Sequence, residues 1–187
     1  MCEFASNWAR FHPNGPPVAH ILREAERETW VRFHSLPRSK RYATSQRENW
    51  TVLDRANKLA SRVLGENASC WLVQAEPDYG DAANDADTYG TVAEHRLEFE
   101  FEHPPLEDDC AYRIFAAPVT WVAGAFNGLI SKRADDALPP TMWVSATTGA
   151  VFAPYDGGTD LFLPTADDVA SLKREFSDWL SDHPDGL

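Results

Sequence analysis

Apolar and polar residues alternate most clearly over residues 142–163, in the stretch MWVSATTGAVFAPYDGGTDLFL. The alternation predicts three short strands, because successive side chains of a strand point to opposite faces of its sheet. Gly149 lies in the first predicted turn, and Asp156 with the two glycines after it forms the second, since these residue types suit tight turns. Consecutive strands joined by such turns form a meander, so we expect a mainly antiparallel sheet.

Four segments upstream also have the composition of strands, namely residues 30–36, 70–75, 95–102 and 112–116. The third of them, HRLEFEFE, alternates most regularly, and its residues Leu97, Phe99 and Phe101 are expected to face the core. Charged residues occupy the positions between them. The other face of this strand is therefore expected to meet water, as an antiparallel sheet allows.

Apolar residues with a helical repeat predict helices over about residues 17–28, 46–64 and 126–137, and a last helix that starts after Thr165. The second of these has the clearest ends. Ser45 and Glu48 match a capping box at its start, and Gly65 is a typical stop. Thr165 is a suitable N-cap for the last helix, whose apolar face is expected to extend to Leu180.

Together these elements predict a single α+β domain over residues 1–187, with a mainly antiparallel sheet of about five to seven strands and helices packed on one face. Three parts of the chain lie outside this core in the prediction. Residues 1–16 are expected to form an extended N-terminal arm. Residues 76–91 are expected to form a mobile acidic loop, and residues 181–187 a polar tail.

Composition excludes several broad classes of protein. A hydrophobic content of 43% argues against a disordered chain, and no apolar run approaches the roughly 20 residues that span a membrane. Residues 1–10 lack the apolar core of a secretion signal. The cysteines Cys2, Cys70 and Cys110 are odd in number and widely spaced, which argues against a disulfide framework and a structural zinc site. We therefore expect a cytoplasmic protein with reduced thiols.

Charge divides unevenly along the chain. Residues 1–65 carry a net charge of +5 and residues 66–187 a net charge of −17, within the total of −12. An acidic body disfavours nucleic acid as a partner and is compatible with a basic protein partner. The alternative is that the acidic surface only keeps the protein soluble.

Two segments carry polar groups that could form a binding site. The cations of the basic stretch 33–42 could hold a phosphate or a carboxylate, and the two aspartates of the loop 154–160 could bind a divalent cation or act as acid and base. The alternatives are a solvated basic loop, a basic loop that pairs with the acidic body, and an aspartate–glycine turn that serves only the fold. The candidate binding residues are His34, Arg38, Lys40, Arg41 and Tyr42 in the first segment and Tyr155, Asp156 and Asp160 in the second.

No catalytic or cofactor motif accompanies these segments. The six histidines show no metal-binding spacing, no Gly-x-Ser-x-Gly element is present, and no glycine-rich phosphate loop precedes a helix. The sequence therefore predicts no catalytic residue, no metal and no cofactor, and it argues against an enzyme more than for one.

Three segments resemble a family of bacterial proteins described only as domains of unknown function: FHSLPRSKRY at 33–42, WVSATTGAVFAPYDGGTDLFL at 143–163 and FSDWLSDHPDGL at 176–187. In that family an HSLP-x-SKRY stretch precedes a helix, and an APYDGG-x-DL stretch precedes the final helix. The resemblance implies no reaction, and no catalytic residue can be transferred from it.

Some small acidic bacterial proteins of unknown function also resemble, in charge and fold, immunity proteins that neutralise toxins. Our leading expectation is therefore a protein-binding module, in its sharpest form an immunity-type inhibitor of a basic toxin, whose acidic charge speeds association. Its expected contacts are Glu98, Glu100 and Glu102 on one strand face, the 76–91 loop and Asp156. The alternative is a small-ligand or hydrolytic site at which the 33–42 and 154–160 segments converge, and a pocket between them would favour it.

Overall fold

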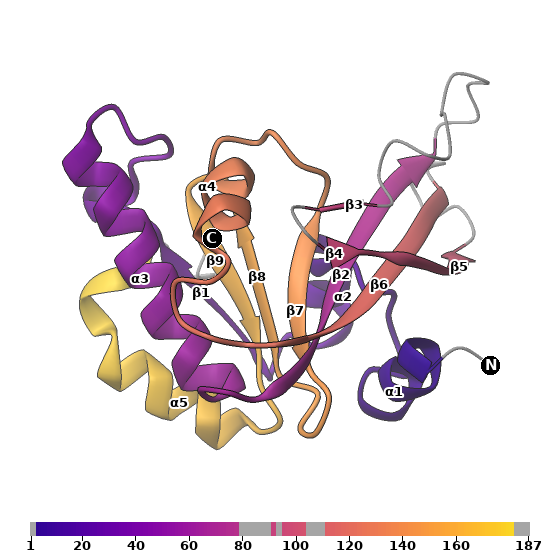
Figure 1. Ribbon diagram of the computed structural model, residues 1–187. Coiled ribbons are helices and arrows are strands. Elements are labelled where there is room, and N and C mark those ends of the chain that lie inside the picture. Colours follow the sequence, from indigo (N-terminus) through magenta and orange to yellow (C-terminus); the bar gives the residue numbers. More distant parts are fainter. Residues whose placement is uncertain (1–2, 79–90, 93–94, 104–110, 182–187) are drawn as a thin grey trace.

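The computed structural model describes residues 3–78, 91–92, 95–103 and 111–181. Its centre is a seven-stranded sheet in which every neighbouring pair of strands is antiparallel (Figure 1). In spatial order the strands are β1 (Trp30–His34), β9 (Gly158–Phe162), β8 (Val151–Tyr155), β7 (Thr141–Ser145), β2 (Ser69–Asp78), β6 (Ala111–Thr120) and β5 (Glu98–His103). Two short strands, β3 (Thr91–Val92) and β4 (His95–Arg96), pair with each other separately. The predicted α+β fold with a mainly antiparallel sheet is confirmed.

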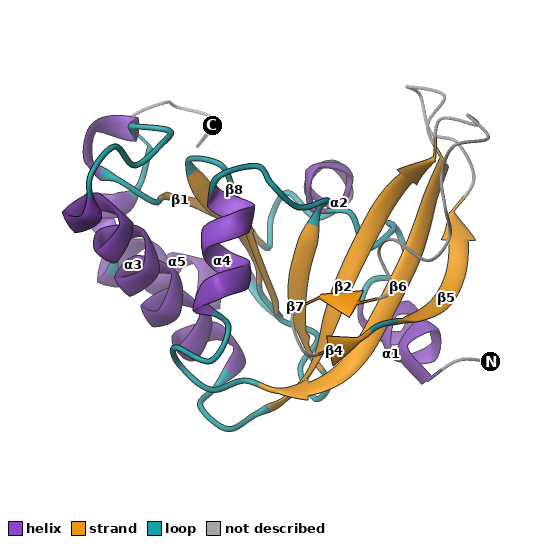
Figure 2. Ribbon diagram, turned by 45° about the horizontal axis from the view of Figure 1, so that its top comes forward, coloured by secondary structure: helices purple, strands orange, loops and turns teal. Residues whose placement is uncertain are grey.

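Three helices cover one face of the sheet: α3 (Gln46–Leu64), α4 (Asn127–Ala134) and α5 (Ala166–Glu175), which lie on the same side in Figure 2. The core beneath them is rich in aromatic rings. Trp121 stacks on Phe126 with ring centroids 5.5 Å apart, and it meets Trp143 edge-on. Such pairs contribute free energy beyond the burial of their apolar area, so they help to hold these helices on the sheet.

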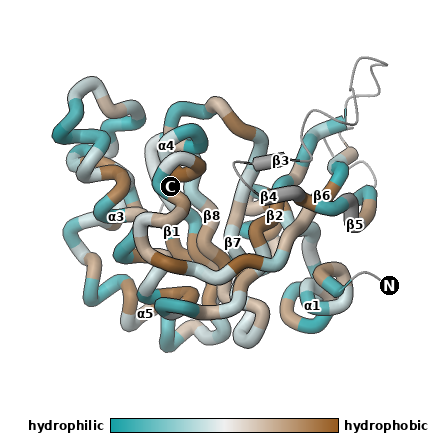
Figure 3. Tube along the Cα trace, viewed as in Figure 1, coloured by the Kyte–Doolittle hydropathy of each residue, from teal (hydrophilic) through white to brown (hydrophobic). Residues whose placement is uncertain are grey.

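Two further helices, α1 (Glu3–Phe11) and α2 (Ala19–Ala25), cover the opposite face. Alternation along β2 shows the division between the two cores. Cys70 and Leu72 pack under α3, whereas Trp71 and Val73 pack under α1. Helices therefore pack on both faces of the sheet. The sequence predicted them on one face only, and this part of the prediction is wrong. The central strands therefore place apolar residues on both faces. Hydrophobic stretches along these strands are brown in Figure 3.

Residues 3–11 form a helix where the sequence predicted an extended arm. Phe4 and Trp8 lie one turn apart on α1 and are both buried, and the Phe4 ring centre is 5.8 Å from that of Trp71. Trp8 Nε1 also donates to Gly15 O at 2.8 Å, so the proline-rich segment after the helix folds back onto it. A helix this short is marginal alone, and contact with the sheet stabilises it.

Local capping signals located α3 correctly. Ser45 Oγ accepts a hydrogen bond from Glu48 N at 3.3 Å, and Gly65 ends the helix with a φ of +91°. The helix begins and ends at the predicted residues because both signals act within one turn.

The last helix starts as predicted and ends early. Thr165 Oγ1 accepts from Asp168 N at 3.2 Å at its start, but α5 ends at Glu175. A 3₁₀ turn over Ser177–Trp179 then leads to Leu180, which forms a β-bridge with Phe33 of the edge strand β1. The chain leaves the helix because this contact covers part of an exposed sheet edge.

Strand β5 breaks the alternation predicted for residues 95–102. The register against β6 shifts once within the strand, as at a β-bulge, and a shift of one residue exchanges the two faces. Leu97 packs in the core under α3, whereas Phe101 packs against the core under α1. Glu98 and Glu102 are both exposed. They lie on opposite faces of the sheet, because Glu98 pairs with Ala116 of the core under α1, whereas Glu102 pairs with Arg113, which points to the other face.

The predicted acidic loop and polar tail lie mostly outside the described residues. Strand β2 extends to Asp78, so the first residues of the 76–91 segment belong to the sheet. Within the parts of the chain that the structure describes, no helix is long and apolar enough to cross a membrane.

Candidate functional site

The segments 33–42 and 154–160 lie side by side because β1 pairs with β9 at the edge of the sheet. His34 is opposite Gly158 in this ladder, and Ser35 N donates to Gly157 O at 3.0 Å. The β8–β9 hairpin thus brings the basic segment against the aspartate–glycine loop, and side chains of the two segments come within hydrogen-bonding reach.

Asp156 is the residue at which the two segments join. Its Oδ2 accepts hydrogen bonds from Tyr42 Oη at 2.8 Å and from Arg41 Nε. Burial raises the pKa of the Asp156 carboxyl, but these two hydrogen bonds outweigh it, so the pKa is lowered and the group is ionised at neutral pH. Gly157 permits the close approach: its φ is +98°, and a Cβ there would lie 3.3 Å from Arg41 Cγ.

Asp160 has a different environment, although it belongs to the same hairpin. It is only 3% exposed, and its carboxylate accepts hydrogen bonds from Arg32 Nε at 2.8 Å, Arg32 Nη2 at 3.1 Å and Trp30 Nε1 at 3.0 Å. Burial lowers the pKa of Arg32, but the hydrogen bond and charge of Asp160 outweigh it, so the pKa is raised. The carboxylate is saturated by protein donors, which leaves it poorly placed to hold a cation or to act as a base.

Tyr155 packs against the Arg32–Asp160 pair. The guanidinium carbon of Arg32 lies 4.9 Å from the centre of the Tyr155 ring, in a cation–π contact. Burial raises the pKa of Tyr155, and the charge of Asp160 raises it further, so the phenol keeps its proton. Gly158 leaves room for this ring, because a Cβ there would lie 2.7 Å from Tyr155 Cζ and 2.9 Å from Phe33 O.

Three of the predicted residues make other contacts. Lys40 Nζ binds both carboxylate oxygens of Glu48, at 2.6 and 2.7 Å, at the start of α3. This ion pair, with a backbone N–H, lowers the pKa of Glu48 to about 2. His34 Nε2 lies 3.0 Å from Ser39 Oγ, and Arg38 is exposed with a φ of +59°.

A cavity of about 210 Å³ lies beside Asp156, and we call it the polar pocket. It opens between α2, α4 and the strands β1, β7, β8 and β9. Of the predicted site residues, Tyr155, Asp156 and Asp160 line it, and Arg41 and Tyr42 contact its wall through Asp156. The polar side chains of the lining are His20, Arg32, Arg133, Thr141, Tyr155, Asp156 and Asp160.

Four polar residues of this lining are not among the predicted site residues, namely His20, Arg32, Arg133 and Thr141. Arg32 is the cross-strand partner of Asp160, so opposite charges on two strands were a signal that needed the strand pairing to be read. His20 and Arg133 come from α2 and α4, and nothing in the local sequence relates them to the aspartate–glycine loop. Arg133 Nη1 donates to Asp136 Oδ1 at 2.7 Å and to Leu138 O at 3.0 Å.

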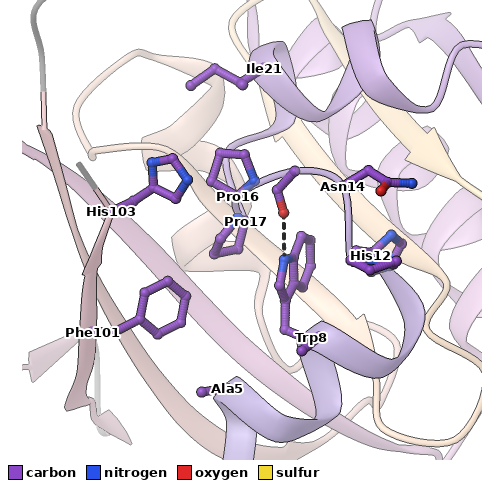
Figure 4. Close-up of a pocket in the computed structure, with 12 residues that line it drawn as sticks. Ala5, Trp8, His12, Asn14, Pro16, Pro17, Ile21, Phe101 and His103 are labelled. Atoms are coloured by element: carbon purple, nitrogen blue, oxygen red, sulfur yellow. Dashed lines mark hydrogen bonds between the residues drawn. The ribbon is translucent and has the colours of Figure 1, made fainter. Parts of the chain in front are cut away.

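A second cavity, of about 520 Å³, lies between α1, the proline-rich segment and β5 (Figure 4). Phe101 projects from the strand toward Trp8, and prolines close the space between them. Trp8 Nε1 is bonded to Gly15 O, and both ring nitrogens of His12 are within 2.8 Å of acceptors. These polar atoms are already used within the protein, and none of the predicted site residues lines this apolar cavity.

Exposed aromatic residues gather beside the basic segment. Tyr42 is 43% exposed and Trp50, on the first turns of α3, is 63% exposed. Trp50 and Arg41 both line a third cavity of about 210 Å³ between the basic segment, α3 and α4. Large exposed rings next to an arginine are typical of binding surfaces.

The expected protein-contact residues lie at different strands of the sheet. Glu98 and Glu102 lie on β5, at one edge of the sheet, whereas Asp156 follows β8, two strands from the other edge. Four strand spacings, roughly 19 Å, separate the two positions. The Glu100 side chain and most of the 76–91 segment lie outside the described residues.

Metal and thiol chemistry find little support in this arrangement. No group of three or more His, Cys, Asp or Glu side chains that could hold a metal ion occurs in the described ranges 3–78, 91–92, 95–103 and 111–181. Cys70 is a free, buried thiol whose pKa burial raises to about 11, so it stays protonated at neutral pH.

Comparison with known proteins places the chain in a family. Neither the curated proteins nor the solved structures contain a match to it. The family described as "Domain of unknown function (DUF3885)" matches residues 18–184, which include both segments of the site. The predicted resemblance to an uncharacterised domain family is thereby confirmed. The chain belongs to the family of the Domain of unknown function DUF3885.

Proposed function

We propose that this protein binds a small polar ligand in the polar pocket. The observation that carries the proposal is the meeting of the 33–42 and 154–160 segments at Asp156, beside a cavity lined by charged side chains. Pockets that combine a few convergent polar groups with perturbed pKa values are the usual location of ligand sites.

The size of the pocket limits the ligand. At about 210 Å³ it is smaller than the roughly 300 to 1,000 Å³ of sites for drug-sized molecules. It suits a small metabolite or one polar group of a larger molecule. Among the described residues the lining contains no serine or cysteine, and Thr141 Oγ1 donates to Pro139 O at 2.8 Å, so we propose binding without a covalent step on a serine, cysteine or threonine nucleophile.

A thermal-shift screen with small polar metabolites tests this proposal, because a ligand that binds the native state raises the melting temperature. Ala19→Leu would fill part of the pocket from α2, and Ala25→Leu adds the same side chain at an exposed position of the same helix. We expect a ligand whose stabilisation is lost in Ala19→Leu and kept in Ala25→Leu. Stabilisation that survives in both variants would place binding elsewhere and contradict the proposal.

A second proposed function is protein binding, with immunity-type inhibition of a basic toxin as its sharpest form. Two observations favour it. The net charge of −12 favours a basic partner and fast association. Arg41, Tyr42 and Trp50 are all exposed, and Arg41 both contacts the Tyr42 ring and lines a cavity with Trp50. Trp, Tyr and Arg are the residue types that carry most binding energy at interfaces.

An affinity pull-down from the native host tests this second function. The wild-type protein is compared with Trp50→Ala and with Glu98→Gln/Glu102→Gln. A stoichiometric basic protein that is released by high salt supports the proposal, and the variant that loses it identifies the surface. A partner that both variants retain in high salt would contradict both surfaces and the electrostatic mechanism.

A further inference from the structure

The two aspartates in the wall of the polar pocket already accept hydrogen bonds from protein donors. Asp160 accepts three hydrogen bonds from Arg32 and Trp30, and Asp156 Oδ2 accepts two from Arg41 and Tyr42. A ligand that offers mainly donors would have to compete with these bonds. Desolvating such a ligand would cost free energy without a matching gain.

Arg133 is different, because part of its donor capacity is unused. The contacts that the structure gives its guanidinium all use Nη1, which binds Asp136 Oδ1 and Leu138 O. Its Nε is buried and has no hydrogen-bond partner among the described residues. A buried donor without a partner destabilises the folded protein. A ligand that supplies an acceptor to this donor would remove that cost, and its binding would be favoured accordingly.

Arg32, in the same pocket, shows how the Nε and Nη2 groups along one edge of a guanidinium can bind an anion. It binds the Asp160 carboxylate side-on, through Nε at 2.8 Å and Nη2 at 3.1 Å. Two parallel N–H···O bonds of this kind match the spacing of carboxylate and phosphate oxygens. Arg133 lines the same pocket, and its buried Nε has no carboxylate partner among the described residues.

The ion pairs around the pocket also distinguish Arg133 from Arg32. Arg32 neutralises Asp160, and Arg41 neutralises Asp156 from outside the pocket. Arg133 is paired with Asp136, whose side chain is 60% exposed, so solvent screens that attraction. The charge of Arg133 also lowers the pKa of Asp156, but Asp156 is bonded to Arg41. An anion would therefore meet a buried guanidinium whose direct carboxylate partner among the described residues lies largely in water.

We propose that the ligand of the polar pocket is an anion that carries a carboxylate or phosphate group, and that Arg133 binds this group through its Nε edge. This inference rests on the proposed ligand-binding function and adds the chemical class of the ligand and its main contact.

The test is a titration of the ¹⁵N-labelled protein, followed through the Nε–H resonances of its arginines. The probes are acetate, inorganic phosphate and acetamide, at constant ionic strength, with chloride as the balancing anion. Acetamide is the neutral isostere of acetate, so this comparison needs no variant. We expect acetate or phosphate to move the Arg133 Nε–H resonance saturably, and the tighter of the two identifies the ligand class.

Two variants locate the effect. Arg133→Gln should weaken binding of the anion at least roughly tenfold, as expected for the loss of a charge-assisted hydrogen bond. Lys132→Gln removes the same charge at the neighbouring exposed position of α4 and should leave binding unchanged. If Arg133→Gln fails to fold, the acetate–acetamide comparison in the wild-type protein still decides the question.

Three results would overturn the inference. Saturable binding of acetamide in the pocket, as tight as that of acetate, would contradict an anion and leave the ligand-binding function intact. Shifts of Arg133 that never saturate would show general anion attraction only. A ligand that is lost in Ala19→Leu but retained in Arg133→Gln would confirm the pocket and remove Arg133 as its contact.

Discussion

Asp156 and Asp160 lie in one β-hairpin, on either side of two glycines, yet the fold gives them opposite roles. Asp160 is buried in the strand and accepts three hydrogen bonds from Arg32 and Trp30. Asp156 lies in the turn and binds exposed side chains of a distant segment, Arg41 and Tyr42. The first fixes the edge of the sheet, and the second joins two loops at the rim of a pocket.

The difference between these aspartates shows that residue type and spacing do not define a paired site. Two carboxylates four positions apart suggested a cation site or an acid–base pair. The structure pairs each of them with a different arginine, Asp156 with Arg41 and Asp160 with Arg32. Burial then decides the energetic consequence, because a buried carboxylate that loses its partner cannot turn to water.

The largest expected effect is that of Asp160→Ala. It would leave the Arg32 guanidinium and Trp30 Nε1 buried without an acceptor, and we expect a loss of about 3–5 kcal/mol in the free energy of unfolding. Urea unfolding at pH 7 measures it, with exposed Asp54→Ala as the control. A loss below about 1 kcal/mol would contradict the structural role of Asp160.

Gly158→Ala tests the packing that separates the two aspartates. The added methyl group would lie 2.9 Å from Phe33 O and 2.7 Å from Tyr155 Cζ, so we expect a loss of about 1–3 kcal/mol. Gly128→Ala, in α4, is the matched control, because no atom lies within 4 Å of its added Cβ. This control should stabilise the protein by about 0.5–1 kcal/mol, as alanine favours helix. Equal effects at both glycines would refute the close approach of Tyr155.

Asp156→Ala should have a smaller effect than either. Its partners are exposed, so we expect the melting temperature to fall by less than about 2 °C. Amide hydrogen exchange in residues 38–42 should become faster, because the contact that holds this segment is lost. A fall of more than about 5 °C would assign Asp156 to the stability of the turn and remove the contrast with Asp160.

The smallest effect concerns a third carboxylate, Glu48, which is partly exposed and paired with Lys40. Its pKa in the folded protein is about 2, below the value of about 4.3 in an unfolded chain. The ion pair therefore stabilises the protein fully above about pH 4.5, and this contribution is lost as the pH falls toward 2. The carboxyl ¹³C resonance of Glu48 should titrate near pH 2, and in Lys40→Met nearer to 4.3. A midpoint near 4.3 in the wild-type protein would contradict the ion pair.

Elements with local signals were predicted well, and those that depend on distant contacts were not. The bounds of α3 follow from Ser45, Glu48 and Gly65, which lie within a turn of its ends. Helix α1 was missed because its two buried residues, Phe4 and Trp8, are held by the sheet. The bulge in β5 was missed because a register shift against β6 leaves no mark on an alternating sequence.

The candidate site divides in the same way. The sequence singled out both segments of the site from their composition, since basic residues and aspartate–glycine turns are visible in one dimension. It also determined the meander that carries Tyr155, Asp156 and Asp160. Tertiary structure alone decided that Arg32 faces Asp160, that Arg133 joins the lining from α4, and that Lys40 turns away to Glu48. These contacts depend on the pairing of β1 with β9 and on the packing of α4. Both bring together parts of the chain that are far apart in sequence, so local sequence patterns do not reveal them.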